Sequence, residues 1–294
     1  EINGIYGGSI NAFQIDKNTG KLSQINSQST KGAYPCHVSI DNFKKYVLVS
    51  NYMGGNIIMY PISKNGFIEN YTAHIMHHGS SKGNLERQEG PHPHSSAFTP
   101  DKRHLLVADL GKDMIIGYKI NSKGELIICE SLSIKIEEGQ GPRHMSFHSN
   151  GKYFYLINEL GNSINFYCYS VEKEALEFIQ KISTLPKIFH NENLAADIHI
   201  HPNGKFLFAS NRGHDSIAIF SINQHNGHLK LIDHQSTFGK HPRNFAIDPT
   251  GNYLLVANKD SNNVVIFKIN KVNGKLTKLN TVLDVPSPTC VEFF

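Results

Sequence analysis

This sequence repeats one segment several times, and charged and imidazole side chains recur at three positions of that segment, each beside a short strand-like run. The first place holds Cys36, His94, Arg143, Ala196, Arg243 and Thr289. The residue that follows is His37, Ser95, His144, Asp197, Asn244 or Cys290. The third place holds Gly4, Tyr52, Leu110, Glu159, Arg212 and Lys259. Because these positions are filled differently from one repeat to the next, they are the candidates for chemistry.

Arginine, histidine and glutamate around one pocket suit an oxygen-rich anionic ligand. Arginine binds carboxylate or phosphate through two parallel hydrogen bonds, and it can hold a developing oxyanion. Histidine or glutamate can act as a general base on water. The sequence contains no Gly-Xaa-Ser-Xaa-Gly motif, which argues against an acyl-enzyme formed on serine. The natural reactions are direct attack of water on an ester or lactone, and proton transfer at a carbon atom.

Each of the three positions corresponds from one repeat to the next, because one motif occurs about five times in the sequence. It spans residues 37–62, 95–120, 144–169, 197–222 and 244–269. Each copy has a short apolar strand, a polar turn, a β-branched and aromatic strand that ends in Asn or Asp, a second turn and a third strand. A turn such as 273–276 leads several copies into a fourth strand. Alternating apolar and polar residues favour strands, and no amphipathic helix of useful length appears.

Repeated four-stranded units of about 40–50 residues predict an all-β fold, a β-propeller whose blades stack around a central channel. A β-solenoid is the weaker alternative, since its repeats are usually shorter. We expect one domain over residues 1–294, with five complete blades and a partial blade shared by the termini. The repeat units run over residues 1–33, 34–90, 91–140, 141–194, 195–240 and 241–286, followed by a closing strand at 287–294. Since the first unit shows only its third and fourth strands, we expect at least one further strand before Glu1.

The propeller would bring the candidate residues together, although they are far apart in sequence. First and second strands of a blade are antiparallel, so the start of one and the end of the other lie at the same end. We therefore expect one mouth of the channel to gather His94, Arg143, Glu159, Arg212, Arg243 and Lys259. The neighbouring His37, His144 and Asn244 join this ligand-binding set. The longest interval between repeats, HHGSSKGNLERQEGPHPH, should fold over the entrance and bring Arg87 and His92 near it.

Several of these features also have structural interpretations. The residue that ends each second strand is predicted to be structural, because Asn and Asp side chains can bond backbone N–H groups of the following loop. It is Asn3, Asn51, Asp109, Asn158, Asn211 or Asn258. The PHPH sequence at 91–94 matches no metal-ligand spacing, so we expect no metal and no cofactor. For Arg143 and Arg243 the alternative is a salt bridge between blades, and for Glu159 it is a solvated loop acid.

Composition excludes several classes of protein. The formal net charge is only +4 and the lysines are scattered, which argues against a nucleic-acid partner. The four cysteines show no metal or disulfide spacing and fit a reducing compartment. No apolar run is long enough to span a membrane, and the start shows no signal-peptide pattern. These observations favour a cytoplasmic protein that does not bind membranes.

Several motifs occur in an order that resembles one family. They include AYPCHVSID (33–41), RQEGPHPHSSAFTPD (87–101), GPRHMSFHSNGKYFYLINE (141–159) and HPRNFAIDPTGNYLLVANKDSNNVVIF (241–267). Over its whole length the chain resembles the bacterial 6-phosphogluconolactonase family of the propeller type, whose superfamily includes the fungal carboxy-muconate cyclase. The resemblance implies a seven-bladed propeller, with about one blade before Glu1.

The resemblance also implies a reaction and a set of residues. The cyclase relatives are thought to use one His, two Arg and one Glu. These roles would fall to His94, Arg143 and Glu159, with Arg212 as the second arginine and Arg243 as its substitute. The implied reaction is hydrolysis of 6-phosphogluconolactone to 6-phosphogluconate, in the pentose phosphate pathway of carbohydrate metabolism. The arginines would bind phosphate and oxyanion, and Glu159 or His94 would activate water.

Two alternatives stay open. One is a lactonising cyclase or isomerase that acts on a dicarboxylate, and the other is a non-catalytic propeller that binds a ligand or a protein. In the leading hypothesis the partner is an anionic small-molecule lactone, and the protein is a cofactor-free hydrolase that is a monomer or a weak homodimer.

Overall fold

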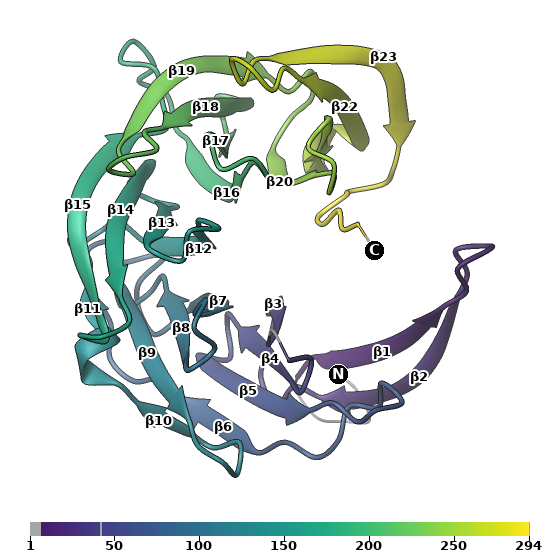
Figure 1. The fold of residues 1–294 in the computed structure, drawn as a ribbon, viewed down its shortest axis with the longest axis vertical. Coiled ribbons are helices and arrows are strands. Elements are labelled where there is room, and N and C mark those ends of the chain that lie inside the picture. Colours follow the sequence, from purple (N-terminus) through teal and green to yellow (C-terminus); the bar gives the residue numbers. More distant parts are fainter. Residues whose placement is uncertain (1–6, 42, 294) are drawn as a thin grey trace. The chain divides into compact units, whose positions relative to one another are not determined.

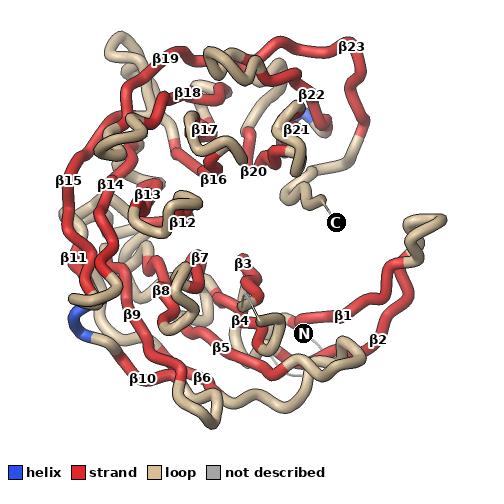
Figure 2. Tube along the Cα trace, in the orientation of Figure 1, coloured by secondary structure: helices blue, strands red, loops and turns tan. Residues whose placement is uncertain are grey.

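The computed structural model describes residues 7–41 and 43–293, so Asn3 and Gly4 lie outside the described residues. The chain forms two compact units, Glu1–Pro142 and Arg143–Phe294. Strands make up almost all the regular structure of the described residues, joined by short turns and by several longer loops (Figure 2). The prediction of an all-β fold is therefore confirmed. The single domain over residues 1–294 and its repeat boundaries stay predictions.

Antiparallel sheets built from consecutive strands make up the first unit. A two-stranded sheet contains β1 (Ser9–Ile15) and β2 (Leu22–Ser29). The next sheet contains β3 (Pro35–Ile40), β4 (Tyr46–Asn51), β5 (Asn56–Pro61) and β6 (Ala73–Met76). The third contains β7 (Pro93–Phe98), β8 (His104–Asp109), β9 (Met114–Ile120) and β10 (Leu126–Ile128). A 3₁₀ turn, η1 (Glu130–Leu132), leads to the short β11 (Ile134–Lys135), which also pairs with β9.

Three four-stranded sheets make up the second unit. The first contains β12 (Pro142–Phe147), β13 (Tyr153–Asn158), β14 (Ser163–Ser170) and β15 (Ala175–Ser183). The second contains β16 (Leu194–Ile200), β17 (Phe206–Arg212), β18 (Ser216–Ile222) and β19 (Leu229–Ser236). The third contains β20 (Pro242–Ile247), β21 (Tyr253–Asn258), η2 (Lys259–Ser261), β22 (Asn263–Ile269) and β23 (Leu276–Asp284). Within this unit the first strands β12, β16 and β20 lie on one side, and β15, β19 and β23 lie on the other (Figure 1).

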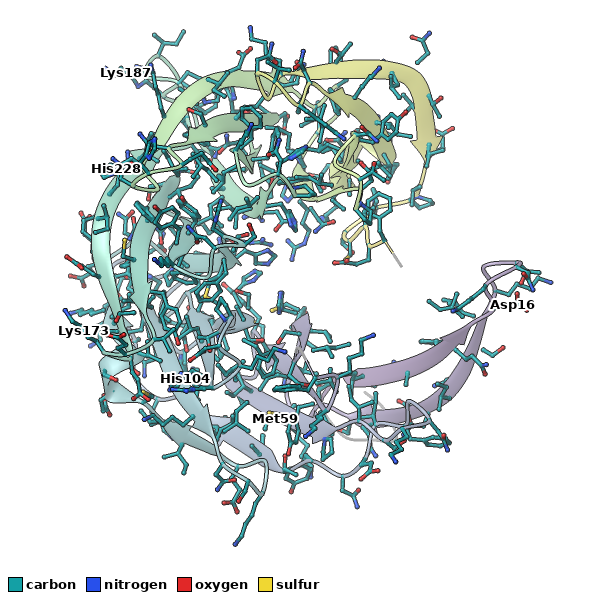
Figure 3. All side chains as sticks on the ribbon, in the orientation of Figure 1. Asp16, Met59, His104, Lys173, Lys187 and His228 are labelled. Atoms are coloured by element: carbon teal, nitrogen blue, oxygen red, sulfur yellow. The ribbon has the colours of Figure 1, made fainter. Side chains whose placement is uncertain are left out.

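Apolar side chains from the faces of neighbouring sheets interdigitate to form the cores. In the second unit one cluster joins Tyr155 and Phe166 to Leu207 and Phe220, all of them fully buried. In the first unit Met59, labelled in Figure 3, packs in the cluster that joins the β3–β6 and β7–β11 sheets. A single sheet exposes both faces, and stacking buries the apolar residues that each strand presents.

Tight turns between strands are closed by polar side chains. Asp16, labelled in Figure 3, accepts hydrogen bonds from the backbone N–H groups of Asn18 and Thr19 at 2.9 Å in the turn between β1 and β2. Gly251 has φ +70° in the turn between β20 and β21, a conformation that glycine adopts without strain. Its carbonyl lies 2.8 Å from His201 Nε2, which joins this turn to the preceding sheet. His201 is 2 % exposed, which supports a structural part for it.

The Asn that ends a second strand connects neighbouring sheets. Asn51, Asn211 and Asn258 donate through Nδ2 to the carbonyls of Thr30, Thr184 and Thr237, at 2.9, 2.8 and 3.1 Å. Each threonine directly follows the last strand of the preceding sheet. The structural interpretation is confirmed, but the expected partner is corrected for these Asn, because they bond the carbonyl of another sheet. Asp109 does accept from the N–H of Lys112, at 3.2 Å, in its following loop.

We expect Asn211→Ala to lower the free energy of unfolding by about 2 kcal/mol, because it removes two buried hydrogen bonds to Thr184, each worth about 1 kcal/mol, while the Thr184 carbonyl keeps His234 Nε2 and its hydroxyl keeps the carbonyl of Asn162. Asn211 is fully buried and also accepts from Thr184 Oγ1 at 2.7 Å. Urea denaturation of the variant and the parent measures the difference. Asn18→Ala in an exposed turn is the matched control. An equal effect at both positions would contradict a connecting role for Asn211.

The closing strand expected over residues 287–294 is not formed in the part of it that the structure describes. Residues 285–293 belong to no strand and follow β23 as loop (Figure 2). The N–H of Val291 donates to Asn244 Oδ1 of β20 at 2.7 Å, as the N–H of Phe245 in β20 donates to Asp197 Oδ2 of β16 at 3.3 Å. The segment therefore contacts β20 as a first strand contacts its neighbour. The described residues of this segment form no strand pairing of their own. Among the described residues, no helix is long and apolar enough to cross a membrane.

Candidate active site

The ends of the strands in the second unit gather a buried ion cluster. Arg143 lies near the start of β12, Glu159 directly follows β13, and Arg212 ends β17. Glu159 Oε2 lies 2.8 Å from Arg143 Nε and 2.9 Å from Arg212 Nη2. The side chains are 2 %, 2 % and 4 % exposed for Arg143, Glu159 and Arg212. One carboxylate between two guanidinium groups leaves the cluster with a net positive charge.

Backbone carbonyls complete the cluster. Arg143 Nη1 donates to the carbonyl of Ala196 at 2.6 Å, and Arg212 donates to the carbonyls of Leu194 and Ala195 at 3.2 and 3.0 Å. Burial lowers the pKa of Arg212 to about 10, Arg143 and Arg243 lower it too, and Glu159 opposes the shift. Arg212 therefore remains charged at neutral pH. The cluster combines the salt bridge within one sheet, to Arg143, with a second one between sheets, to Arg212.

A second cluster surrounds the carboxylate of Asp197 in β16. Asp197 Oδ1 lies 2.7 Å from His144 Nδ1 of β12, and Oδ2 lies 3.0 Å from His199 Nε2. Asn244 of β20 donates to Oδ2 at 2.7 Å. The backbone N–H groups of Ile198 and Phe245 also donate to this carboxylate, at 3.0 and 3.3 Å. His144, Asp197 and Asn244 occupy the same position in three successive first strands, and the structure links them directly.

The titration of this cluster follows from its partners. Burial acts to raise the pKa of Asp197, but His199 and His144 outweigh it and hold that pKa well below its ordinary value. Burial and Arg143 lower the pKa of His144 to about 4, against the opposing effect of Asp197. Burial acts to lower the pKa of His199, yet Asp197 raises it above its ordinary value. At neutral pH the cluster therefore holds an ionised Asp197 and a neutral His144.

Further cations lie at the same end of the second unit. Arg243 is the second residue of β20 and Lys259 begins η2, and Pro242 pairs with Asn258 across the two strands β20 and β21. His241 Nδ1 and Lys259 Nζ lie 3.2 and 3.3 Å from the two carboxylate oxygens of Asp260. Burial, Arg212 and other nearby cations lower the pKa of His241, although Asp260 opposes them. This end of the unit therefore carries several cations beside the carboxylates of Glu159 and Asp260, and the predicted anionic ligand stays a prediction.

In the first unit Tyr52 contacts three of the predicted site residues, His92, His94 and Arg87. The His92 ring stacks on Tyr52 at 4.4 Å between ring centroids, and the His94 ring meets it edge-on at 5.6 Å. Arg87 Nη2 donates to Tyr52 Oη at 3.1 Å. Both histidines are 4 % exposed. His37 Nδ1, in β3, accepts from the N–H of Ser96 in β7 at 3.4 Å.

The geometry adds two residues to the predicted set. Tyr52 follows the strand-ending Asn, where other repeats place Glu159 and Arg212, and Asp197 occupies the position of His144. Their positions, equivalent to those of predicted site residues in other repeats, were the feature of the sequence that could have identified them. The predicted residues fall in both units: His37, Arg87, His92 and His94 in the first, and Arg143, His144, Glu159, Arg212, Arg243, Asn244 and Lys259 in the second. Their roles in a common site stay predictions.

Metal ligation is not favoured at the histidines around Asp197 or at His92. His144 Nδ1 and His199 Nε2 each point at a separate oxygen of Asp197 within hydrogen-bonding distance. His92 Nδ1 lies 2.9 Å from the carbonyl of Tyr52, and Nε2 lies 2.9 Å from Glu89 Oε1. These nitrogens are engaged by oxygen atoms of the protein and are not directed at a vacant position.

Repeated antiparallel sheets, with charged and imidazole side chains at the ends of their first and second strands, define a protein of the β-propeller class. The chain matches the family model described as lactonase, 7-bladed beta-propeller, over residues 2–293. It is 38 % identical over 286 residues to a 6-phosphogluconolactonase of Bacillus subtilis, covering 97 % of this chain and 80 % of that protein. The chain belongs to the seven-bladed lactonase family.

Solved structures agree with this assignment. A putative 6-phosphogluconolactonase of Bacteroides fragilis has a TM-score of 0.91 and 37 % identity, covering 98 % of this chain and 82 % of that one. The periplasmic gluconolactonase of Pseudomonas aeruginosa also has a TM-score of 0.91, with 27 % identity, 97 % of this chain and 79 % of that one. The predicted family is confirmed, and these relatives carry the names of two different lactonases.

Proposed function

We propose that the protein hydrolyses an aldonolactone that carries an anionic group, with 6-phosphogluconolactone as the leading substrate. The observation that carries the proposal is the buried carboxylate of Glu159 held between Arg143 and Arg212, at an end of the second unit that also bears Arg243 and Lys259. A preorganised set of buried cations stabilises negative charge that develops in a transition state. The membership in the lactonase family supports the reaction class.

The chemistry requires no covalent intermediate on the protein. The oxygen of water attacks the lactone carbonyl carbon while a base takes a proton from that water. The carbonyl oxygen becomes an oxyanion beside the arginines, and the bond from the carbonyl carbon to the ring oxygen then breaks. The ring oxygen takes a proton, and the product is the open-chain hydroxy acid. A single proton is therefore moved from water to the leaving oxygen.

The outer cations suit recognition of the substrate's own charge. Arg243 is partly exposed and the Lys259 side chain is 37 % exposed, whereas Arg143 and Arg212 are buried. Exposed cations can meet a phosphate group, and a buried pair of arginines is suited to stabilise an oxyanion. We therefore assign the phosphate to Arg243 and Lys259 within the proposal.

Lactone hydrolysis measured against the spontaneous rate tests this function. We expect the protein to accelerate opening of 6-phosphogluconolactone, with a lower rate on gluconolactone, which lacks the phosphate. A muconolactone serves as the third substrate, because turnover of that compound alone would indicate a cyclase. Rates equal to the spontaneous rate for all three lactones would contradict the proposal.

Arg243→Ala is expected to raise KM for 6-phosphogluconolactone by about 10-fold, with a much smaller change for gluconolactone, because a charged hydrogen bond to phosphate is worth about 1.5 kcal/mol or more. Steady-state kinetics on both lactones measure the two ratios. Lys230→Ala, which removes an exposed lysine of β19, controls for the change in net charge. A rise in KM of the same size for both lactones would show that Arg243 does not recognise phosphate.

A further inference from the structure

The first unit departs from the pattern of the repeats in the turns that join first and second strands. These turns align over residues 41–46, 99–104, 148–153, 201–206 and 248–253. The fourth residue of each turn has a left-handed backbone, and it is Gly151, Gly204 and Gly251 in the second unit but Lys44 and Lys102 in the first. Because glycine adopts this conformation without strain and lysine does not, the turn itself does not explain the two lysines.

A second departure lies in the same turns. The third residue is polar in four of them, where it is Asp101, Asn150, Asn203 or Thr250. The turn between β3 and β4 has Phe43 instead, which is 57 % exposed. The two departures meet at this ring, since Lys102 Nζ lies 4.2 Å from the centroid of Phe43 and Lys45 Nζ lies 5.7 Å from it. The negative face of an aromatic ring attracts ammonium groups, so Phe43 holds two cations near each other.

These side chains border a pocket of about 220 Å³ between the β3–β6 and β7–β11 sheets, which pack side by side (Figure 1). We call it the turn pocket, and its lining includes the apolar Phe43, Phe98 and Ile120 and the polar Lys45, Lys102 and Ser122. It lies where β3, β7 and β9 end, whereas the candidate residues His37 and His94 lie near the starts of β3 and β7. The turn pocket is therefore at the opposite end of these strands from the candidate active-site residues.

The turn pocket carries more positive than negative charge. Lys45 and Lys102 line it, and neither forms an ion pair with a carboxylate of the described residues. The acid in the lining is Asp41, whose carboxylate accepts hydrogen bonds from the backbone N–H groups of Phe43, Lys45 and Tyr46 at 3.1, 2.6 and 2.7 Å. Asp41 therefore closes its own turn, while the two lysines, both exposed, are available to an anion.

We propose that the turn pocket binds a small phosphate ester, with Lys45 and Lys102 on its phosphate group. This inference goes beyond the proposed function and does not depend on it. Lysine binds phosphate as a compact point charge, and the exposed Ser122, just after β9, can donate a further hydrogen bond. The organic part of the ester would contact the apolar side of the pocket. Pockets for drug-sized ligands measure about 300–1,000 Å³, so we expect a ligand no larger than a monosaccharide phosphate.

This role explains why a strained residue stands at position 102. Strained backbone positions cluster where a side chain has a function, and glycine in the equivalent turn of three other sheets shows that the turn forms without a side chain. Lys102, at φ +65°, adds an ammonium group to the pocket at the cost of that strain. Lys44 has φ +55° but does not line the pocket, so it provides a matched control within the chain.

Calorimetric titration of the full chain with glucose 6-phosphate tests the proposal. We expect Lys102→Gly and Lys45→Ala each to weaken binding by about 10-fold, because each removes a charged hydrogen bond to phosphate. Lys44→Gly makes the same substitution in the equivalent turn of the neighbouring sheet and should bind as the parent does. No binding by the parent, or equal affinity of the parent and Lys102→Gly, would overturn the proposal. An equal loss in both glycine variants would also overturn it, since net charge alone would explain that result.

Urea denaturation of the same variants separates binding from folding. Glycine is relaxed at φ +65°, so Lys102→Gly is expected to unfold at a urea concentration no lower than that of the parent. A clearly lower midpoint would show that Lys102 serves the fold and would contradict its assignment to a ligand.

Three other probes define the class of ligand. Glucose lacks the phosphate, gluconate carries a carboxylate and no phosphate, and inorganic phosphate lacks the organic part. We expect each to bind about 10-fold more weakly than glucose 6-phosphate, because each lacks one of the two kinds of contact. Glucose, gluconate or inorganic phosphate bound as tightly as the ester would overturn the proposed class.

A further comparison separates the turn pocket from the candidate active site. The difference between the parent and Lys102→Gly should persist when both proteins also carry Arg243→Ala, because Arg243 belongs to the second unit. Loss of that difference would assign the binding to the candidate active site and overturn the inference. A protein that opens no lactone but keeps the difference would contradict the proposed function alone.

Discussion

Replacing Arg143 by alanine is expected to lower kcat/KM for the lactone by about 100- to 1,000-fold, because loss of one preorganised donor to an oxyanion has effects of that size. The guanidinium is 2 % exposed and is fixed by Glu159 at 2.8 Å and by the carbonyl of Ala196 at 2.6 Å. It therefore needs no reorganisation when negative charge appears on the substrate. Steady-state kinetics on 6-phosphogluconolactone, corrected for spontaneous hydrolysis, measure the loss.

Two further variants separate chemistry from loss of structure. Arg143→Lys keeps a positive charge but cannot hold Glu159 and the carbonyl of Ala196 in the same planar geometry, so we expect most of the loss to persist. Arg103→Ala removes an arginine whose side chain is 67 % exposed and should behave as the parent. The folded fraction of each variant, measured by circular dichroism, normalises the rates. An Arg143→Lys protein as active as the parent would show that charge alone suffices at this position.

Replacing Glu159 by alanine is expected to lower the free energy of unfolding by about 3–5 kcal/mol. The substitution leaves two guanidinium groups, 2 % and 4 % exposed, without the carboxylate that both contact. Uncompensated buried charge is far more costly than loss of a surface ion pair, which is worth at most about 1 kcal/mol. Urea denaturation measures the difference between the variant and the parent.

A double variant identifies the source of that loss. Removing Arg212 together with Glu159, as Arg212→Met with Glu159→Gln, deletes one cation along with the anion and should restore part of the stability. Glu177→Ala, on the exposed face of β15, is the matched control and should change the free energy by less than about 0.5 kcal/mol. Strictly additive effects of the two substitutions would contradict a shared buried ion cluster.

The sequence was sufficient to predict the frame of the fold. Period-two patterns and repeated turns predicted four-stranded units, and the sheets from β3 to β23 follow them. The antiparallel order also placed the start of a first strand beside the end of a second strand, as Leu194 beside Arg212 in the β16–β17 ladder. These features depend on local residue types and on pairing within one sheet, which a single repeat already encodes.

Contacts between sheets were not predictable in the same way. Equivalent positions predicted that Arg143, Glu159 and Arg212 share an end, yet nothing in their spacing indicated that one oxygen of Glu159 would meet both arginines. Asp197 was seen only as one member of a varied position, although it is the centre of a cluster. Which side chains meet across neighbouring sheets depends on how the sheets pack, and each partner comes from a different repeat.

The strand-ending residue illustrates the same limit. Its structural part follows from its recurrence in every repeat, whereas its partner was expected in the next loop. Asn51, Asn211 and Asn258 instead reach the threonine after the preceding sheet. The closing strand at 287–294 was expected because propellers often share one blade between their termini, but a strand also needs a neighbouring strand with which its backbone can pair. Residues 285–293 are held by the bond from Val291 to Asn244 and by bonds from Val285 and Ser287 to Asn262, and they form no strand.

Two bonds in the described part of the chain resemble the bond from Val291 to Asn244, and together the three limit which substitutions this protein can accept. His37 and Asp197 accept the backbone N–H of Ser96 and Phe245 in the next first strand, and Asn244 accepts that of Val291 in the C-terminal loop. Under the proposed function, a side chain at such a position would meet the substrate and also join two neighbouring segments. Only residues with an acceptor atom at the right distance meet both requirements. Substitutions that change specificity at these positions are therefore restricted to a few acceptor side chains. A library randomised there should return mostly Asp, Asn and His among its folded members, whatever substrate is used for selection.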